Sequence, residues 1–294
     1  MNIIRVFPRR TSYTPGDGMA FVGDPPGLLI PPHDEVHISC AFTWDKAECE
    51  RLRYQWQMYT DKPVKLGGPA YASPCGTFEP GMYVKRGVTF TSYGCNNKCA
   101  FCLVPGREGA LRELPVTEGN IIQDNNFLQC SRSHKDAVFA MLKSQAQICF
   151  KGGLQNDLID DHFVENVRGL RIKELWLACD DDAAVDGMAR AVEKLKKAGF
   201  AREHIRCYVL IGTRLHRHKT IDDIDIGETT MQENERRLQA VYAAGAMPFA
   251  QILQPAECFC EYPPEWKKFA RQWMRPPSII AHCERGTDMN DYST

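Results

Sequence analysis

Residues 93–102 read Tyr93-Gly94-Cys95-Asn96-Asn97-Lys98-Cys99-Ala100-Phe101-Cys102, which places three thiols at CxxxCxxC spacing with an aromatic residue just before the third. Three thiolates from one short loop can ligate three irons of a [4Fe-4S] cluster. No fourth cysteine continues this spacing, so one iron would keep an open position. An open iron can bind a small molecule. The spacing therefore predicts a cluster with a coordination site for a second molecule.

Two other interpretations of these cysteines stay open: half of a zinc site, or simply buried thiols. Zinc usually takes four ligands from paired CxxC units. No second CxxC follows at the usual interval, and the nearest later pair, Cys258 and Cys260, is separated by one residue. The spacing favours the iron-sulfur cluster, with the false-positive risk that every short motif carries.

The motif resembles that of the radical S-adenosylmethionine (radical SAM) enzymes, and in that family the cofactor's amino and carboxylate groups chelate the open iron. Carried over, the metal ligands are Cys95, Cys99 and Cys102. The resemblance implies that a reduced cluster cleaves S-adenosylmethionine and leaves a 5'-deoxyadenosyl radical, which abstracts hydrogen from a substrate. It also implies an electron donor such as flavodoxin or ferredoxin.

Composition and charge narrow the class of protein. The chain has 294 residues, 44% of them hydrophobic, and a net charge of −1. It is long enough to bury a full core and lacks the basic character of a protein that binds extended nucleic acid, although a local site stays open. It has no signal peptide and no run of about 20 apolar residues, so we expect a soluble cytoplasmic protein. Thirteen scattered cysteines fit a reducing compartment.

From Gly87 onward, short apolar strands alternate with helical segments. The predicted strands are 87–92, 120–124, 147–151, 174–179, 205–211 and 247–253, and the predicted helices are 134–143, 160–169, 183–198 and 230–244. This alternation is typical of a parallel sheet covered by helices. We expect an α/β fold whose residues 85–255 form a partial (β/α)6 barrel of the TIM type, as the resemblance also implies. Reactive groups would lie at the strand C-termini, where the cysteine motif falls.

The first 84 residues predict a small βαβ domain, with strands at 3–7, 35–42 and 63–66 and a helix at 45–58. It resembles the cobalamin-binding domain that precedes the barrel in one radical SAM subgroup. The DxHxxG loop of that subgroup is absent: the nearest segment is Asp34-Glu35-Val36-His37-Ile38-Ser39. Cobalamin binding is not expected, and His37 is interpreted as a hydrogen-bonded strand residue. Residues 256–294 would form a helical C-terminal extension.

The resemblance also implies which residues contact S-adenosylmethionine, beginning with Phe101 before the third cysteine. The Gly-Gly-Glu motif common after the family's second strand is replaced by Asp124-Asn125-Asn126-Phe127. Asp124 or Asn125 could accept the cofactor's ammonium group. A polar turn with Asn125 or Asn126 in the left-handed region is the alternative. Gly152 would close the third strand, with a simple turn as its alternative.

The remaining cofactor contacts would come from the fourth, fifth and sixth strands. Asp180 is placed to accept from the ribose hydroxyls, although Asp180 to Asp182 could instead cap the next helix. Tyr208 and Gly212 resemble the fifth-strand pattern, in which the glycine lets the backbone approach adenine. Gln251 and Leu253 are the sixth-strand counterparts, at positions where any strand would look similar.

Two later segments carry weaker signals. The insertion at 213–226 is basic in part and could meet an anionic substrate, although a solvated loop is the favoured interpretation; its basic residues include Arg214, His216, Arg217, His218 and Lys219. After the barrel, Trp266, Phe269 and Trp273 could form a buried helix face. An auxiliary cluster would need Cys258, Cys260 and Cys283 together with Cys75 or Cys130, and packing is the alternative. Four cysteines in apolar runs are expected in the core: Cys40, Cys149, Cys179 and Cys207.

Two functional classes follow. The first is a radical enzyme that acts on a small molecule or a modified macromolecule, with an anionic substrate as one candidate. The second is a non-catalytic iron-sulfur or zinc module on the same barrel. Within the enzyme class, the missing DxHxxG loop counts against cobalamin-dependent methylation, and the lack of a second three-cysteine set counts against sulfur insertion. Isomerisation, oxidation and carbon-carbon chemistry are left.

Overall fold

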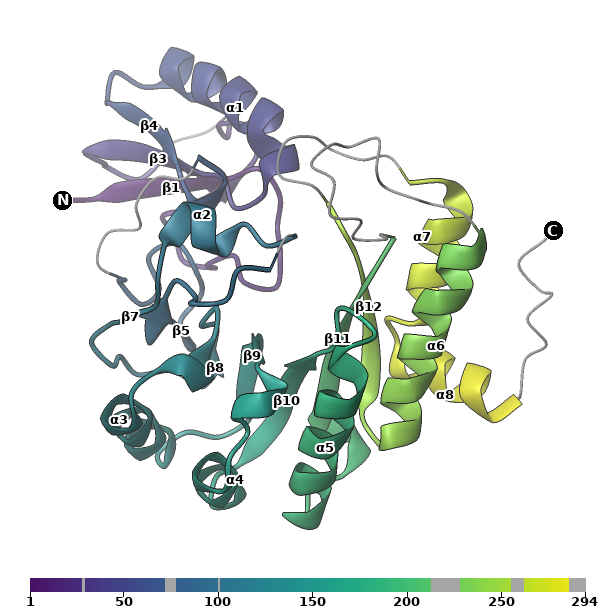
Figure 1. The fold of residues 1–294 in the computed structure, drawn as a ribbon. Coiled ribbons are helices and arrows are strands. Elements are labelled where there is room, and N and C mark those ends of the chain that lie inside the picture. The colour runs from purple at the N-terminus through teal and green to yellow at the C-terminus, as the bar shows by residue number, and fades with distance from the viewer. Residues whose placement is uncertain (28–29, 72–77, 100, 213–227, 255–261, 286–294) are drawn as a thin grey trace.

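The fold is built on two β-sheets of parallel strands, one in the N-terminal part of the chain and one in the part that follows (Figure 1). The computed structural model describes residues 1–27, 30–71, 78–99, 101–212, 228–254 and 262–285. A four-stranded sheet lies within residues 3–67, and a six-stranded sheet lies within residues 88–252. No helix in the described residues combines the length and apolar character that crossing a membrane requires.

The N-terminal sheet comprises β1 (Ile3–Phe7), β2 (Ala20–Val22), β3 (Glu35–Ser39) and β4 (Val64–Gly67), in the order β2-β1-β3-β4. Helix α1 (Lys46–Tyr59) covers one of its faces. Because side chains alternate along a strand, Ile4 and Val6 reach this core, where Trp56 is also fully buried. The expected βαβ unit is present as β3, α1 and β4, and β2 is an additional strand that was not predicted.

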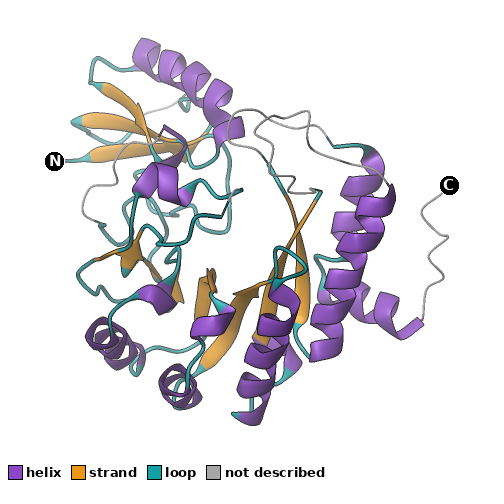
Figure 2. Cartoon of the chain, in the orientation of Figure 1, coloured by secondary structure: helices purple, strands orange, loops and turns teal. Residues whose placement is uncertain are grey.

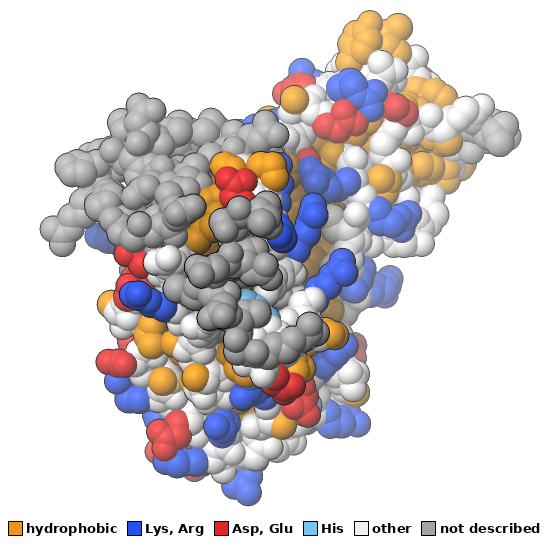
Figure 3. Space-filling view, turned by 90° about the vertical axis from the view of Figure 1, so that its right-hand side faces the viewer, with side chains coloured by type: hydrophobic (Ala, Val, Ile, Leu, Met, Phe, Trp, Pro, Cys, Tyr) orange, Lys and Arg blue, Asp and Glu red, His pale blue; other side chains and the backbone are white. Residues whose placement is uncertain are grey.

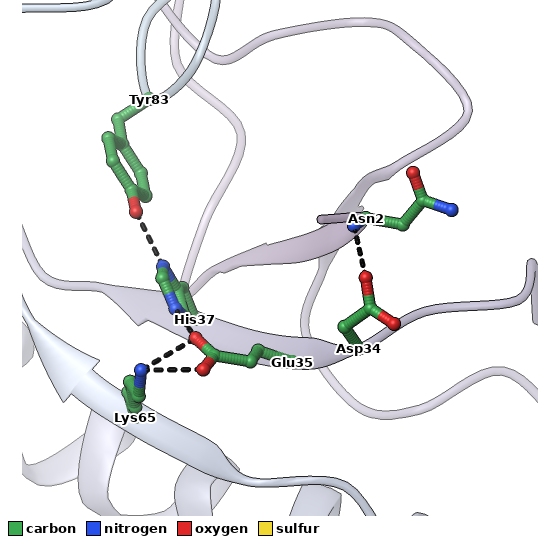
Figure 4. Close-up of polar contacts among 6 residues, drawn as sticks. All are labelled: Asn2, Asp34, Glu35, His37, Lys65 and Tyr83. Carbon is green, nitrogen blue, oxygen red and sulfur yellow. Dashed lines mark hydrogen bonds and ion pairs between the residues drawn. The ribbon is translucent and has the colours of Figure 1, made fainter.

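The opposite face of this sheet is polar, and its side chains bond to one another (Figure 4). Nε2 of His37 lies 2.7 Å from Oε2 of Glu35, and Nδ1 lies 2.5 Å from the hydroxyl of Tyr83. Lys65 Nζ donates to both carboxylate oxygens of Glu35, at 2.7 Å each. Both ring nitrogens of His37 therefore have partners, as expected of a hydrogen-bonded strand residue.

The main sheet is built from six strands in the order β12-β11-β10-β9-β8-β5, all parallel. The strands are β5 (Val88–Thr89), β8 (Ile121–Ile122), β9 (Ile148–Leu154), β10 (Ile172–Ala178), β11 (Ile205–Ile211) and β12 (Met247–Ile252). Strands β5 and β12 are its edges, and no pairing among the described residues closes it into a barrel. The α/β class with parallel strands and covering helices is confirmed.

Four helices lie along the outer side of the main sheet (Figure 2). They are α3 (Arg132–Leu142), α4 (Asp161–Arg168), α5 (Ala184–Lys197) and α6 (Glu228–Ala244). Their apolar faces pack on Phe150, Leu175, Leu177 and Val209 to form the main core. Short 3-10 helices connect elements at Thr43–Asp45, Pro69–Tyr71, Phe127–Gln129, Asn156–Leu158 and Arg202–His204.

Helices α7 (Pro264–Gln272) and α8 (Pro276–Arg285) follow β12 and complete the core at that edge. Trp266, Phe269 and Trp273 are fully buried, which confirms the predicted helix face. The surface on this side carries basic and acidic side chains interspersed, as Figure 3 shows.

Most element bounds agree with the sequence prediction, and β11 has the predicted limits. The single strand predicted at 87–92 is wrong, because this segment contains two separate strands, β5 and β6 (Ser92–Tyr93). The four cysteines expected in the core, Cys40, Cys149, Cys179 and Cys207, are all buried.

Candidate functional site

The cysteine loop, residues 94–99 and 101–111, is an excursion closed at its base by an antiparallel pair. Strand β6 pairs with β7 (Arg112–Glu113), and the backbone N–H of Leu114 donates to the carbonyl of Thr91 at 2.8 Å. Within the loop, Cys95 N–H donates to the Gly109 carbonyl at 3.2 Å, and α2 (Val104–Glu108) forms a short helix. This anchoring places the thiols beside the C-terminal edge of the main sheet, because β5 ends just before the loop.

All three thiols of the loop are free. Cys95 and Cys102 are half-buried and Cys99 is exposed, and a turn brings Cys102 N–H to 3.0 Å from the Cys99 carbonyl. Desolvation of the sulfur raises the pKa of the Cys102 thiol and, although the Cys99 residue as a whole is exposed, of the Cys99 thiol too. The charges of Cys95 and Asp180 raise both further, while the Val104 backbone and Arg107 oppose the rise at Cys102.

The donor chemistry of these thiols suits an iron-sulfur cluster, but the thiols are not preassembled. Among the described residues, no group of three His, Cys, Asp or Glu side chains is placed to hold a metal ion. Two donors do point at the first sulfur: Asn97 N–H at 3.4 Å and Asn126 Nδ2 at 3.8 Å from Cys95 Sγ. Such N–H contacts to sulfur are typical of cluster ligands. Binding would have to gather the other two thiols around the cluster.

Asp124 holds the base of the cysteine loop. One oxygen of its carboxylate accepts from the Thr91 N–H at 2.6 Å, and the other accepts from the hydroxyls of Thr91 at 2.5 Å and Ser92 at 2.8 Å. Asp124 is 1% exposed, and burial raises its pKa against the effect of these hydrogen bonds. The sequence analysis did not predict this structural role. Both carboxylate oxygens of Asp124, one candidate acceptor for a cofactor ammonium group, already accept hydrogen bonds from Thr91 or Ser92.

Gly152 lies inside β9 and does not form the simple turn considered from the sequence. A Cβ atom on Gly152 would lie 1.5 Å from the carbonyl oxygen of Asp124. The strand must therefore carry glycine here for the chain after β8 to pass over it. Gly152 and Asp124 together fix the path of the backbone beside the cysteine loop.

Asn125 and Glu108 connect the end of β8 to the loop. Glu108 Oε2 accepts from the Gly94 N–H at 3.2 Å and from the side-chain amide of Asn125. Its other oxygen accepts from Arg107 Nε at 3.0 Å. Asn125 thus contacts the cysteine loop, and Glu108 is a site residue that sequence reasoning missed.

Four carboxamides form a hydrogen-bonded group behind Cys95, called here the amide cluster: Asn97, Asn126, Gln129 and Gln155. The Gln155 Oε1 atom accepts from the other three, at 3.1 Å, 2.9 Å and 3.1 Å respectively. The Oδ1 atom of Asn126 is buried and has no hydrogen-bond partner in the described structure. Neither Asn125 nor Asn126 adopts the left-handed conformation considered from the sequence, since Gln147 is the non-glycine residue with positive φ in the described chain.

The three aspartates after β10 have separate roles. Burial raises the pKa of Asp180 to about 6, while a hydrogen bond with the Leu210 backbone opposes this. Asp181 Oδ1 accepts from the N–H of Ala184, the first residue of α5, at 2.9 Å, whereas the N-cap position itself is Ala183 and has no side-chain capping bond. Asp182 pairs with Arg237 at 3.0 Å. Asp180 is the aspartate of this group whose charge helps to raise the pKa of the Cys99 and Cys102 thiols.

Gly212 follows β11 with φ of +85°, and a Cβ there would lie 2.6 Å from the ring of Tyr262. Tyr262 also donates its hydroxyl hydrogen to the Gly212 carbonyl at 3.2 Å. Packing against Tyr262 therefore requires this glycine, a reason that the sequence did not reveal. An adenine contact stays a prediction.

The other predicted cofactor contacts lie at separate places around the sheet. Phe101 is half-buried in the cysteine loop, Gln251 is exposed on β12, and Leu253 N–H pairs with the Ile211 carbonyl at 3.0 Å. Their contact with a cofactor stays a prediction. The insertion at 213–226 and the cysteines Cys75, Cys258 and Cys260 lie outside the described residues; Cys283 is half-buried and Cys130 is buried.

The inner side of the main sheet carries polar and aromatic side chains, called here the inner wall: Lys151, Glu174, Trp176, Arg206 and Tyr208. Their strand neighbours Phe150, Leu175, Leu177, Cys207 and Val209 belong to the core on the outer side. Parallel sheets are usually apolar on both faces. The inner side of these strands is therefore not part of the apolar core.

Contacts within the inner wall fix most of its charges. Lys151 pairs with Glu174, whose Oε2 also accepts from the Trp176 indole at 2.8 Å. Burial raises the pKa of Glu174, but these hydrogen bonds outweigh it and hold the pKa below its ordinary value. The Tyr208 hydroxyl donates to the Lys151 carbonyl at 3.1 Å, and its ring centroid lies 4.3 Å from that of Trp176. Tyr208 thus belongs to the wall rather than to the strand ends.

A cavity of about 460 Å³ lies apart from this site, against the polar face of the N-terminal sheet. Its lining includes Arg5, Asp17, Gly81, Met82 and Lys85. Arg5 donates to the carbonyls of Gly81 at 3.2 Å and Met82 at 3.0 Å and pairs with Asp17. These contacts tie the segment after residue 78 to the sheet, which gives the charges at this cavity a structural role.

Comparison with known proteins gives one partial similarity. The chain is 30% identical over 104 residues to the ribosomal protein uS12 methylthiotransferase RimO of a Nitratiruptor species. The match covers 34% of this chain and 23% of RimO, so the chain spans about a quarter of that relative's length. No protein-family model matches the chain. This similarity agrees with the superfamily that the cysteine motif resembles.

Proposed function

We propose that this protein is a radical SAM enzyme in which Cys95, Cys99 and Cys102 hold a [4Fe-4S] cluster and S-adenosylmethionine binds at the open iron. The observation that carries the proposal is the position of the cysteine loop. Three free thiols at CxxxCxxC spacing lie at the C-terminal edge of a parallel sheet, where α/β proteins place their reactive groups. The partial similarity to RimO supports it.

The proposed organisation is a βαβ domain at 1–84, a partial (β/α)6 barrel at 85–255 and an extension at 256–294. The separate cores of the two sheets support the first boundary. The consecutive strand order from β5 to β12 supports a barrel-like curvature of the second unit.

The chain's own groups would bind the cofactor and exclude water. When bound, the reduced cluster would supply the one electron that cleaves S-adenosylmethionine into methionine and a 5'-deoxyadenosyl radical. Asn97 and Asn126 would donate hydrogen bonds to the Cys95 thiolate, and Asp180 would accept from a ribose hydroxyl. The inner wall would hold the substrate beneath the strand ends, shielded from solvent.

A second candidate within the superfamily is methylthio transfer, which the similarity to RimO favours. RimO is named for acting on ribosomal protein uS12, and a modified macromolecule is therefore one candidate substrate. The single three-cysteine set in this chain weighs against a sulfur-inserting reaction. A non-catalytic iron-sulfur or zinc module is the alternative outside the enzyme class.

Anaerobic reconstitution with iron and sulfide tests the proposal. With dithionite and S-adenosylmethionine, we expect the full chain to form 5'-deoxyadenosine, and we expect Cys99→Ala to lose both the iron and the product. Cys40→Ala, which changes a buried core cysteine of the N-terminal sheet, is the matched control and should retain both. A preparation that binds zinc in preference to iron, or that binds iron equally well in Cys99→Ala, would refute the cluster assignment.

A further inference from the structure

Arg206 is a buried cation whose side chain makes no hydrogen bond and no ion pair with the described residues. It lies on β11 between Ile205 and Cys207, both of which face the main core, so its side chain belongs to the inner wall. The residue is 8% exposed, and its Nε atom is buried without a hydrogen-bond partner. Its guanidinium lies over the ring of Trp176, 5.0 Å from Cζ to the ring centroid, and Lys151 Nζ lies 4.3 Å from the same centroid.

The surroundings of Arg206 do not neutralise it. The nearest carboxylate on the wall, Glu174, already pairs with Lys151 and accepts from Trp176. Lys151, Glu174 and Arg206 therefore leave one positive charge uncompensated on this wall. Burial lowers the pKa of Arg206 against the opposing attraction of Glu174, yet an arginine stays protonated in proteins. A buried, unpaired charge is costly to keep, so a fold that keeps one gains from an anion that binds there.

Arg5 provides an internal comparison. It is a strand residue of similar burial, 6% exposed, and its Nε is likewise buried without a hydrogen-bond partner, but its terminal guanidinium nitrogens donate to two backbone carbonyls and pair with Asp17. The fold can therefore supply partners to a buried arginine. The inner wall, as far as the structure describes it, does not supply them to Arg206.

We propose that Arg206 binds a carboxylate or phosphate group of the substrate, with the Trp176 ring as the platform on which the guanidinium is held. A planar guanidinium suits both anions because it can donate two parallel hydrogen bonds to them. The proposal rests on the proposed function only in calling this ligand the substrate.

The position of Arg206 also constrains the length of the ligand. Arg206 is paired in register with Trp176, four residues before Asp180 on the neighbouring strand. At about 3.3 Å per residue, Arg206 lies roughly 13 Å below the level of Asp180. A molecule that meets both the strand ends and Arg206 is therefore extended, with its anionic group at the deep end.

Thermal unfolding of the iron-free full chain tests this proposal without any radical chemistry. Wild type, Arg206→Met and Arg5→Met are compared in a buffer of low ionic strength, with and without inorganic phosphate or acetate. We expect Arg206→Met to unfold at or above the wild-type temperature without anion, because it removes an unpaired charge. Arg5→Met should unfold below the wild-type temperature, because it removes made hydrogen bonds.

The anion titrations then separate the two ligand classes. We expect a saturable rise in the wild-type unfolding temperature with phosphate, acetate or both, and a loss of affinity of about tenfold or more in Arg206→Met. A response to phosphate alone assigns a phosphate ester, a response to acetate alone assigns a carboxylate, and a response to both assigns their shared oxyanion chemistry. An anion effect that Arg206→Met retains, or the absence of any effect on wild type, would overturn the proposal.

A second variant keeps the proposal falsifiable if Arg206→Met does not fold. Arg206→Lys retains the charge and loses the two-pronged donor, so it should respond to anions more weakly than wild type and more strongly than a neutral Arg206→Gln. An equal response in all three proteins would count against Arg206 as the anion site. Because none of these measurements uses iron or S-adenosylmethionine, they can fail or succeed independently of the 5'-deoxyadenosine assay.

Discussion

The carboxylate of Asp124 makes two hydrogen bonds with Thr91: it accepts from the backbone N–H at 2.6 Å and from the hydroxyl at 2.5 Å. Thr91 is the last residue before β6, and β6 opens the cysteine loop. A buried side chain on one strand end thus sets the starting point of the loop that carries the thiols.

Removing the hydrogen bonds between Asp124 and Thr91 should destabilise the base of the cysteine loop. Asp124→Ala leaves the buried Thr91 N–H without its acceptor, so we expect a loss of about 2 kcal/mol in the free energy of unfolding and reduced iron uptake. Asp124→Asn should lose less, because the hydroxyls of Thr91 and Ser92 can turn to accept from the new amide. Urea unfolding and iron content measure both effects. An alanine variant as stable as wild type would show that these hydrogen bonds contribute nothing to the fold.

Gly152→Ala should disrupt the same region from the other strand. The added methyl would lie 1.5 Å from the Asp124 carbonyl oxygen, a contact that only a backbone shift can relieve. We expect a destabilisation of about 3 kcal/mol, at the upper end of the usual cost of overpacking. Gly18→Ala is the control, because its Cβ would meet nothing within 4 Å, and it should stay within about 0.5 kcal/mol of wild type. Equal effects of the two substitutions would contradict the close approach.

Asp180 should make stability depend on pH. Its pKa is about 6 in the fold, above the ordinary value of 3.8, so the folded protein holds this proton more tightly than the unfolded chain does. The cost of ionising it is absent below pH 3.8, grows as the pH rises, and is complete above pH 6. At about 1.4 kcal/mol for each tenfold change in proton affinity, the full cost is up to about 3 kcal/mol.

The Asp180→Asn variant removes that titration. It should be more stable than wild type at neutral pH, and the difference should vanish toward pH 4, as chemical unfolding across this range would measure. Asp61→Asn, at an exposed position, should show no such trend. A stability difference between Asp180→Asn and wild type that stays constant with pH would mean that burial does not perturb this carboxyl.

The amide cluster should restrain the first cysteine. Gln155→Leu removes the one oxygen that accepts from Asn97, Asn126 and Gln129, so three donors lose a partner. We expect faster amide hydrogen exchange at residues 95–97, by about tenfold or more, with little change in the core strands. Unchanged exchange at Cys95 and its neighbours would show that the loop is held by its backbone contacts alone.

The long elements of the main sheet could be read from the sequence because their apolar runs are bounded by turn residues. Strand β11 has the predicted limits, and α5 ends as expected just before Gly199. The short pieces β5, β6, β7 and α2 could not be read, since two to five residues are too few to show a period. Their existence depends on what they pair with.

The candidate site was predictable only in its outline. The cysteine spacing identified the loop, but the partners of Asp124, Gly152 and Gly212 depend on segments that meet only after folding. The inner wall had a signal that went unused: Glu174 and Trp176 alternate with leucines, and Arg206 and Tyr208 alternate with core residues. Polar residues at every second position of a buried parallel strand indicate a face that is not core.

The strand order of the main sheet has a consequence for how the protein is made. In the main sheet, each of the strands β8, β9, β10, β11 and β12 pairs with the strand of this sheet that comes just before it in the chain. The strand to which a new strand pairs has therefore always been synthesised already. The sheet can therefore grow by accretion as the chain leaves the ribosome, in keeping with the N-terminal-first folding of nascent proteins. The strand with an unpaired edge would change with each addition, ending with β12. Helices α7 and α8, which leave the ribosome last among the described elements, then pack against β12.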